Sequence, residues 1–138
     1  MTIRSLKNPL YILSFLYYQA KINSKKNSSY QKGLYAEQAA KNYLQTKNLQ
    51  FITNRLKTPF GEIDLLMQYN NILIAVEVKL RNTTKYGTAT DSLSSQQVRR
   101  IGNALTYYQQ KKSLKTHLRI DLICFNKNQP IKWLKNID

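Results

Sequence analysis

Two runs of alternating apolar residues, at positions 61–69 and 72–81, place the strongest constraint on the fold of this chain. In both runs apolar side chains occupy every second position, which is the pattern of a β-strand. Asn70 and Asn71 separate the runs. Asparagine tolerates the positive φ that a two-residue hairpin turn requires. The sequence therefore predicts an antiparallel hairpin with the two asparagines at its tip.

The turn also determines which residues face each other across the hairpin. If the residues that flank the turn pair, Asp64 faces Glu77 and Glu62 faces Lys79. Residues two apart on a strand share a face, so all four side chains project from the same side. Directly opposed Cβ atoms lie about 4.5–5.5 Å apart. We therefore expect Asp64 and Glu77 to be close enough to share one ion.

The charge of the chain makes this carboxylate pair unusual. The sequence has seven acidic residues against twenty-two lysines and arginines, for a net charge of +15, and Glu62, Asp64 and Glu77 are three of the seven. Like charges that face each other across strands destabilise a sheet unless something neutralises them. Lys79 is one candidate for the neutralising charge, and Mg²⁺ is the other. Proteins hold Mg²⁺ through one or two carboxylates plus water and phosphate oxygens.

Two interpretations of this cluster follow. One is a surface salt-bridge cluster of Glu62, Asp64, Glu77 and Lys79. The other, which we favour, is metal-dependent phosphodiester cleavage. In that chemistry carboxylates hold the metal that lowers the pKa of the attacking water, and a lysine orients the water or stabilises developing negative charge.

The motifs GEIDL at 61–65 and VEVKLR at 76–81 resemble the PD-(D/E)XK signature of restriction-endonuclease-like nucleases. The chain is most similar to the YraN-like family of predicted endonucleases, and the similarity extends from about residue 33 to 133. The resemblance implies a restriction-endonuclease-like αβββαβ core of the α/β class. It implies that Asp64 and Glu77 bind Mg²⁺, with Mn²⁺ as a substitute, and that Lys79 is the catalytic lysine. It further implies that Glu37 is the additional catalytic acid that resolvase-like members carry on their first helix.

One position departs from the family pattern. Similar proteins commonly carry a lysine on the helix after the site, where this chain has Gln96. Glutamine retains hydrogen-bonding capacity but has no charge. Two functions therefore stay open: a metal-dependent DNA nuclease, of which a structure-specific, resolvase-like enzyme is one form, and a catalytically weak or inactive nucleic-acid-binding module of the same fold.

The basic composition favours a polyanionic partner, because neutralising phosphates releases counterions and drives binding that is independent of sequence. Solubility alone is the alternative explanation of such a charge. Near the acidic hairpin and on the next helix, the residues expected to contact DNA are Lys79, Arg81, Lys85, Tyr86, Gln96, Arg99 and Arg100.

Other classes of site are excluded by composition. A single cysteine, Cys124, and a single histidine, His117, leave no intramolecular disulfide and no zinc site built from several of either residue. Cys124 lies in an apolar run and is expected in the core, whereas His117 is expected to be exposed. Four scattered glycines do not form a phosphate-binding loop.

Two regions are expected along the chain: an amino-terminal extension and linker at 1–29 and an endonuclease-like domain at 30–138. The apolar segment at 9–18 is too short to span a bilayer, which needs roughly 20 residues. We prefer a short helix packing on the domain, ahead of an interfacial segment on anionic lipid and a cleaved signal. Membrane contact is therefore not expected, a cytoplasmic location is, and a homodimer is compatible with the sequence.

The remaining elements are predicted from periodicity. A helix at 30–47 has an apolar stripe, and Glu37 lies at its edge. A first strand at 51–55 precedes the hairpin, a loop is expected at 82–91, and a second helix at 92–112. A buried strand at 118–126 and a short edge strand at 131–134 complete a mixed sheet flanked by helices. The apolar stripe of the first helix comprises Ala36, Ala39, Ala40, Tyr43 and Leu44.

Overall fold

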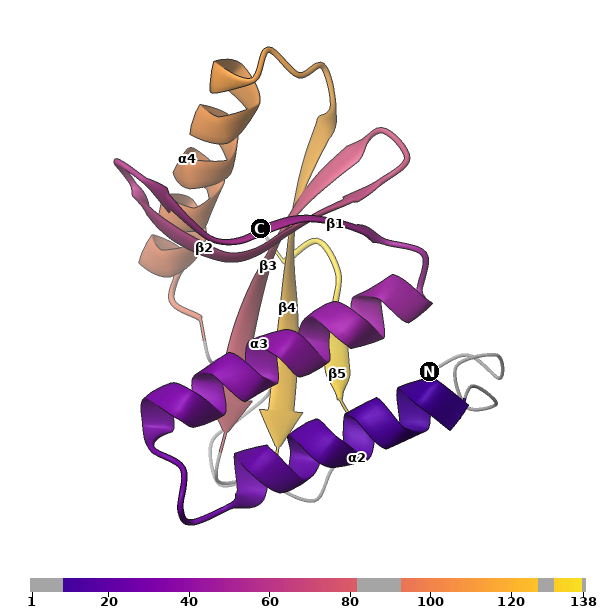
Figure 1. Ribbon diagram of the computed structural model, residues 1–138. Coiled ribbons are helices and arrows are strands. Elements are labelled where there is room, and N and C mark those ends of the chain that lie inside the picture. Colours follow the sequence, from indigo (N-terminus) through magenta and orange to yellow (C-terminus); the bar gives the residue numbers. More distant parts are fainter. Residues whose placement is uncertain (1–8, 82–92, 127–130, 138) are drawn as a thin grey trace.

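The computed structural model describes residues 9–81, 93–126 and 131–137 of the 138-residue chain. From α3 to β4 the order of elements is αβββαβ, which confirms the predicted α/β core (Figure 1). The elements are α2 (Pro9–Asn23), α3 (Ser29–Thr46), β1 (Gln50–Thr58), β2 (Gly61–Tyr69), β3 (Ile72–Arg81), α4 (Ser95–Lys111), β4 (His117–Asn126) and β5 (Lys132–Leu134).

The strands form one mixed sheet in the order β1-β2-β3-β4-β5. Strands β3 and β4 are parallel, and the other neighbours are antiparallel. A parallel pair needs a crossover connection, and here α4 lies in the chain between β3 and β4. The predicted loop at 82–91 lies outside the described residues.

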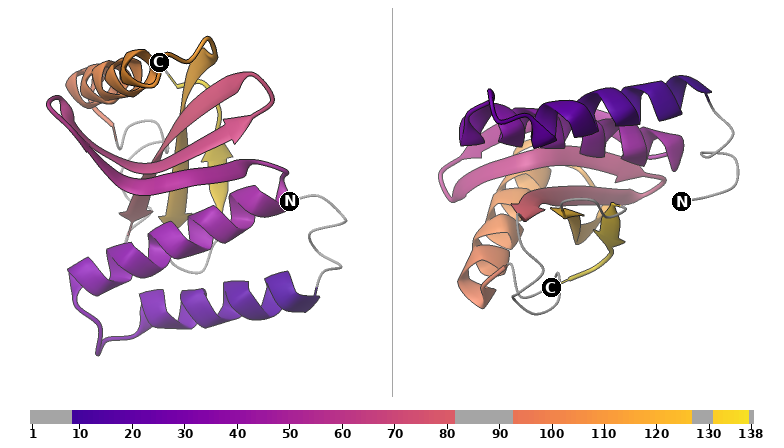
Figure 2. Two further views of the ribbon diagram at one scale, coloured as in Figure 1. Left: turned by 45° about the horizontal axis from the view of Figure 1, so that its top comes forward. Right: turned by 90° about the horizontal axis from the view of Figure 1, so that it is seen from below.

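Helices cover both faces of the sheet (Figure 2). On one face the predicted apolar stripe of α3 is buried against apolar residues of β2, β3 and β4. On the other face α4 buries Ile101, Ala104 and Leu105. Cys124 is fully buried and His117 is exposed, as expected.

The hairpin turns explain the register. Asn70 has a φ of +50°, and Tyr69 pairs with Ile72, which confirms the predicted turn. A second two-residue turn pairs Thr58 with Gly61. Strand β1 therefore extends to Thr58, three residues beyond the predicted end, because this turn keeps the polar end of the strand in the ladder.

Both long helices of the core begin with a capping box. Ser28 and Gln31 cap α3, and Ser94 and Gln97 cap α4 through reciprocal side-chain to backbone hydrogen bonds. Such a pair satisfies two of the free N–H groups of the first turn. The cap at Ser94 explains why α4 begins at Ser95 and not at the predicted position 92.

The amino-terminal helix α2 packs beside α3. The side-chain amide of Asn42 donates to Ser14 Oγ at 2.7 Å, and Ile22 is buried in the core cluster that α3 forms. A packing helix was the preferred interpretation of this segment. In the part of the chain that the structure describes, no helix combines the length and the apolar character that crossing a bilayer needs.

Candidate metal centre

Strands β2 and β3 separate at the predicted carboxylate pair. Their ladder runs from the turn to Leu65 and Val76, one pair short of Asp64 and Glu77. At the point of separation, the backbone N–H of Val78 donates to Asp64 Oδ2 at 2.9 Å. The side chain of Asp64 thus replaces a backbone acceptor and lies in the fork between the two strands.

The separation corrects two predicted ladder pairs, Asp64 with Glu77 and Glu62 with Lys79. Beyond Asp64, β2 continues its ladder with β1, where Glu62 faces Lys57. In the described structure, therefore, the ladder pair of Glu62 with Lys79 is not formed. Lys79 instead makes its ion pair with Glu77, with 3.5 Å between Nζ and Oε1.

Asp64 and Glu77 meet in the fork, although the ladder does not pair them. Their carboxyl groups lie close enough that each one shifts the pKa of the other. The Glu77 side chain is only 13% exposed and that of Lys79 is 30% exposed, so the carboxylates lie deeper than the amine. The predicted proximity of Asp64, Glu77 and Lys79 is confirmed.

Burial and mutual repulsion raise the affinity of this pair for protons. Burial raises the pKa of Asp64, although the hydrogen bond from Val78 opposes the rise. Burial, followed by the charge of Asp64, raises the pKa of Glu77 from 4.5 to about 7, against the opposing charge of Lys79. Near neutral pH the pair therefore holds a proton for part of the time, which is the behaviour of two carboxylates that share one site.

Glu37 approaches the fork from α3. Its Oε2 accepts a hydrogen bond from Arg55 Nε at 3.0 Å, and its side chain is 14% exposed. Burial raises the pKa of Glu37; the bond to Arg55 lowers it, and the charges of Asp64 and Glu62 raise it further. Glu37 thus faces the hairpin, as predicted, but an arginine holds it. Among the described residues, no three acidic, histidine or cysteine side chains gather tightly enough to form a metal cluster.

Sequence reasoning missed Arg55, the partner of Glu37. Arg55 Nη1 also donates to the hydroxyl of Tyr30 at 3.0 Å, and its guanidinium lies over the Tyr30 ring. Its φ is +49°, and the ladder pairs the residues on either side of it, Asn54 and Leu56. The two-residue turn between β1 and β2 contains the missing signal, since counting back from it places Arg55 opposite Asp64.

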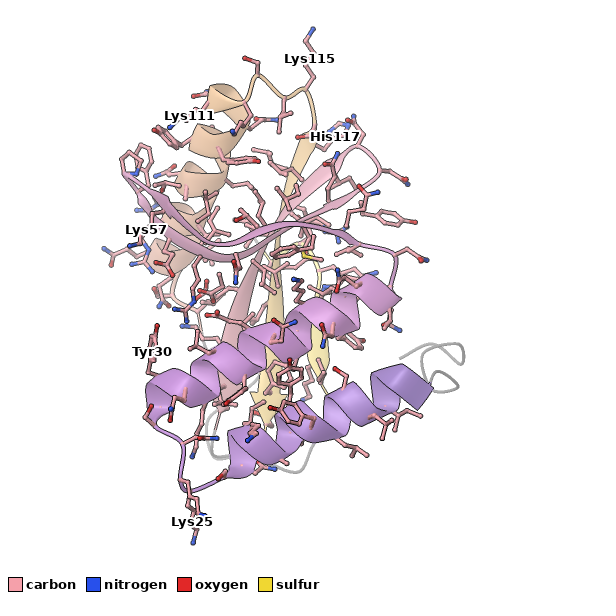
Figure 3. All side chains as sticks on the ribbon, in the orientation of Figure 1. Lys25, Tyr30, Lys57, Lys111, Lys115 and His117 are labelled. Carbon is pink, nitrogen blue, oxygen red and sulfur yellow. The ribbon has the colours of Figure 1, made fainter. Side chains whose placement is uncertain are left out.

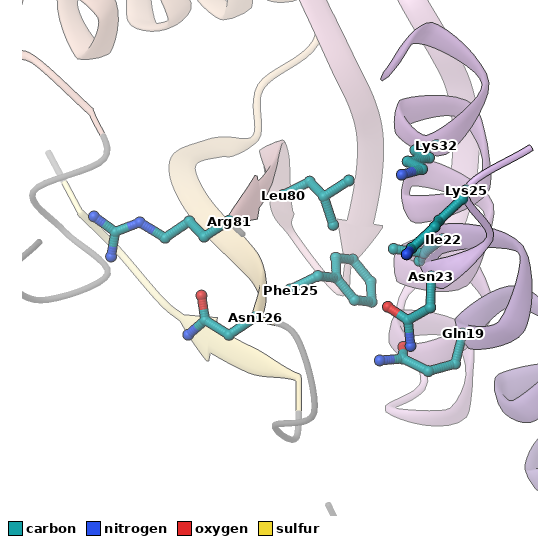
Figure 4. A pocket seen from close by; sticks show the side chains of 9 residues that line it. All are labelled: Gln19, Ile22, Asn23, Lys25, Lys32, Leu80, Arg81, Phe125 and Asn126. Carbon is teal, nitrogen blue, oxygen red and sulfur yellow. The ribbon is translucent and has the colours of Figure 1, made fainter. Parts of the chain in front are cut away.

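The predicted DNA-binding residues fall into separate places. Gln96, Arg99 and Arg100 line one cavity of about 450 Å³. Arg81 lines another, of about 210 Å³, between α2, α3 and the ends of β3 and β4, where its side chain extends away from Lys25 and Lys32 (Figure 4). Lys85 and Tyr86 lie outside the described residues.

The glycine of GEIDL leaves room for the side chain of Arg100. Gly61 has a φ of +133°, which side chains rarely adopt, and a Cβ atom there would lie 2.9 Å from Cδ of Arg100. Glycine therefore permits both the backbone conformation and the close approach of the arginine stem. The motif thus joins the β1–β2 hairpin to α4.

Another buried carboxylate, Asp121, has structural partners. Arg119 donates to both of its oxygens at 2.9 Å, and Trp133 Nε1 and the backbone N–H of Asn136 each donate at 3.0 Å. Asp121 is fully buried, and these bonds satisfy its charge. It ties the carboxyl-terminal segment to β4.

Comparison with known sequences assigns the chain to a protein family. The profile described as "Uncharacterised protein family UPF0102" matches residues 36–125, from the first half of α3 to the end of β4. The chain belongs to this family. A UPF0102 protein of Shewanella frigidimarina is 39% identical over 103 residues, which cover 75% of this chain and 94% of that protein.

Further UPF0102 relatives show the same extent of similarity. One from Shewanella baltica is 40% identical over 102 residues, covering 74% of this chain and 94% of its own length. One from Shewanella denitrificans is 34% identical over 103 residues, covering 75% of this chain and 94% of its own length. The UPF0102 match contains Asp64, Glu77, Lys79 and α4, whereas α2 precedes it.

Proposed function

We propose that this UPF0102 protein is a Mg²⁺-dependent DNA endonuclease of the PD-(D/E)XK, YraN-like type. The observation that carries the proposal is the meeting of Asp64 and Glu77 in the fork, with the Lys79 amine 3.5 Å from Glu77. Two carboxylates and a lysine on neighbouring strands form the set that this motif uses. The order of elements and the basic charge of the chain agree with it.

The donor set suits a divalent cation. Asp64 and Glu77 would hold it, because Mg²⁺ is normally bound by one or two carboxylates, with water and substrate oxygens filling the other positions. Near neutral pH the pair holds a proton for part of the time, because burial and the charge of Asp64 raise the pKa of Glu77. A cation would replace that proton, and metal binding to carboxylates is coupled to proton release in this way. Once bound, the ion supplies Lewis acidity toward the phosphate and a more acidic water.

The other residues of the chain have distinct roles in the proposal. Lys79 holds a positive charge beside Glu77, where it orients the attacking water or stabilises the charge that develops on the phosphate. Glu37, fixed by Arg55, assists from α3 and adds negative charge behind Asp64. Arg99 and Arg100 supply positive charge for the DNA backbone.

The test is a cleavage screen with Mg²⁺ or Mn²⁺ over duplex, flap, four-way-junction and single-stranded DNA. Lys79→Ala is expected to reduce cleavage at least about 100-fold while DNA affinity survives, because removal of one charge-stabilising group commonly costs this much. Asp64→Asn is the blank, since an amide keeps an acceptor for Val78 but loses the charge. Lys115→Ala is the matched control, because it removes one lysine from the connection beyond α4 (Figure 3).

Two results would overturn the proposal. Equal cleavage by wild type and Lys79→Ala would remove the lysine from the mechanism, and products that persist in Asp64→Asn would expose a contaminating nuclease. Tight, salt-dependent DNA binding with no metal-dependent products would favour the second function, a catalytically weak or inactive nucleic-acid-binding module. Gln96 is the observation that favours this binding module, because it places an uncharged amide in the arginine-lined cavity.

A further inference from the structure

The cavity that contains Arg99 and Arg100 has a wall that the sequence did not suggest. It lies between α4 and the turn that joins β1 to β2, and Figure 1 shows this turn beside the helix. Its lining comprises Phe60, Gln96, Gln97, Arg99, Arg100 and Asn103, with a volume of about 450 Å³. An aromatic ring, two guanidinium groups and several amides thus surround one space.

Phe60 is exposed yet held in place. It is 47% exposed at the tip of the β1–β2 hairpin, and its ring lies edge-on to Tyr107 of α4, with 6.2 Å between centroids. Its backbone N–H donates to Thr58 Oγ1 at 3.1 Å, and that hydroxyl donates to the Gly61 carbonyl at 2.7 Å. Because the preceding Pro59 also restricts the turn, the ring loses little freedom when a ligand covers it.

The polar part of the lining suits a nucleotide. Arg99 and Arg100 are exposed cations that can bind a phosphate, and the stem of Arg100 passes close to Gly61. Gln96 and Asn103 bring amide groups that can bond to the edge of a base. Aromatic stacking combined with cationic groups is the pattern of proteins that bind single-stranded nucleic acid.

The cavity is connected to the carboxylate fork by a single strand. Phe60 precedes Asp64 by four positions on the β1–β2 hairpin, a span of roughly 13 Å at about 3.3 Å per residue. A base inside a duplex is stacked on its neighbours, so only an unpaired base can present its face to Phe60. The distance from the fork is on the scale of a few nucleotides of single strand.

We propose that Phe60, with Arg99 and Arg100, binds an unpaired nucleotide of DNA. Resting on the proposed nuclease function, this site directs cleavage to DNA that contains a single-stranded segment beside the bond to be cut. Continuous duplex binds through its phosphates alone and does not use the Phe60 ring.

The experiment measures binding without metal, so that it does not depend on cleavage. Fluorescence anisotropy with EDTA compares a single-stranded oligonucleotide with a blunt duplex. Phe60→Ala is expected to weaken single-strand binding about 5- to 150-fold, the range for loss of one stacked base, and duplex binding less than about 2-fold. Phe60→Trp restores binding because it restores a stacking face. Tyr69→Ala is the matched control, since it removes an exposed aromatic from the other end of β2.

A second readout reports stacking directly. The fluorescence of 2-aminopurine in the single strand is quenched when the base stacks, so wild type and Phe60→Trp are expected to quench it and Phe60→Ala to leave it bright. Arg99→Gln is expected to lower the affinity for both the single strand and the duplex, and to lower the salt dependence of binding.

Two outcomes would overturn the proposal: unchanged single-strand affinity in Phe60→Ala, or an equal loss for both DNA forms. Either result would refute the nucleotide site without refuting the nuclease function. A lack of metal-dependent cleavage would refute the nuclease function without refuting the nucleotide site.

Discussion

Replacing Glu77 with glutamine should stabilise the metal-free protein at neutral pH. Glu77 is buried next to Asp64, and its pKa rises from 4.5 to about 7 even with Lys79 beside it. A pKa raised on folding means that the folded state binds the proton more tightly than the unfolded chain. The ionised form of Glu77 therefore costs stability that a neutral amide does not cost.

The size and sign of the effect follow from the two pKa values. A rise from 4.5 to about 7, at about 1.4 kcal/mol per pH unit, corresponds to about 3 kcal/mol. Between these values the folded state holds more protons, so the free energy of unfolding falls as pH rises from about 4.5 to 7 and the loss is complete above that. Glu77→Gln should match wild type near pH 4.5 and exceed its stability by up to about 3 kcal/mol at pH 8.

The assay is urea unfolding with EDTA at pH 5 and pH 8. At pH 8, saturating Mg²⁺ should raise the stability of wild type and have less effect on Glu77→Gln, because a ligand that binds only the folded state stabilises it. Glu62→Gln is the matched control: it neutralises an exposed glutamate on the same hairpin and should change stability by less than about 0.5 kcal/mol. A Glu77→Gln protein that is equally or less stable than wild type at pH 8 would refute the reasoning.

Two further predictions concern the frame around the site. Asp121→Asn should lower the free energy of unfolding by about 3 kcal/mol, because it breaks a buried ion pair whose carboxylate accepts bonds from Arg119, Trp133 and Asn136; a loss below about 1 kcal/mol in urea unfolding would contradict that role. Gly61→Ala should cost about 1–3 kcal/mol through its positive φ and the contact with Arg100. The matched control, Gly33→Ala in the interior of α3, has open space and should gain about 0.5–1 kcal/mol; equal effects at the two glycines would refute the Gly61 argument.

Local pattern was enough to predict most of the fold. The α3 stripe is buried as expected because helical periodicity alone decides which face packs. The Asn70 turn set the β2–β3 register correctly because a short turn leaves the strands little choice. Helix α4 begins three residues after its predicted start, since the Ser94 cap depends on a side-chain hydrogen bond that periodicity does not reveal.

The site could be predicted from the sequence only up to the point where the β2–β3 ladder ends, at Leu65 and Val76. Asp64, Glu77 and Lys79 come together as expected, because the turn sets the register up to the pair Leu65–Val76, although the ladder ends there and does not pair these three residues. The fork was not predicted, since the separation of β2 from β3 depends on how both strands pair with their other neighbours. The sequence does not predict the roles of Arg55 and Phe60 for a related reason: both depend on the turn between β1 and β2, and the predicted first strand ends at residue 55, before that turn.

The hydrogen bond from Val78 to Asp64 has a consequence for reading sequences of this family. Asp64 completes the backbone bonding of a sheet at the point where two strands part, so its loss would weaken the fold as well as any chemistry. Selection for a folded protein alone would then preserve this aspartate, even in a lineage that had lost activity. Under the proposed nuclease function, Lys79, which is partly exposed and ion-paired with Glu77, would therefore be the more informative residue to compare among relatives.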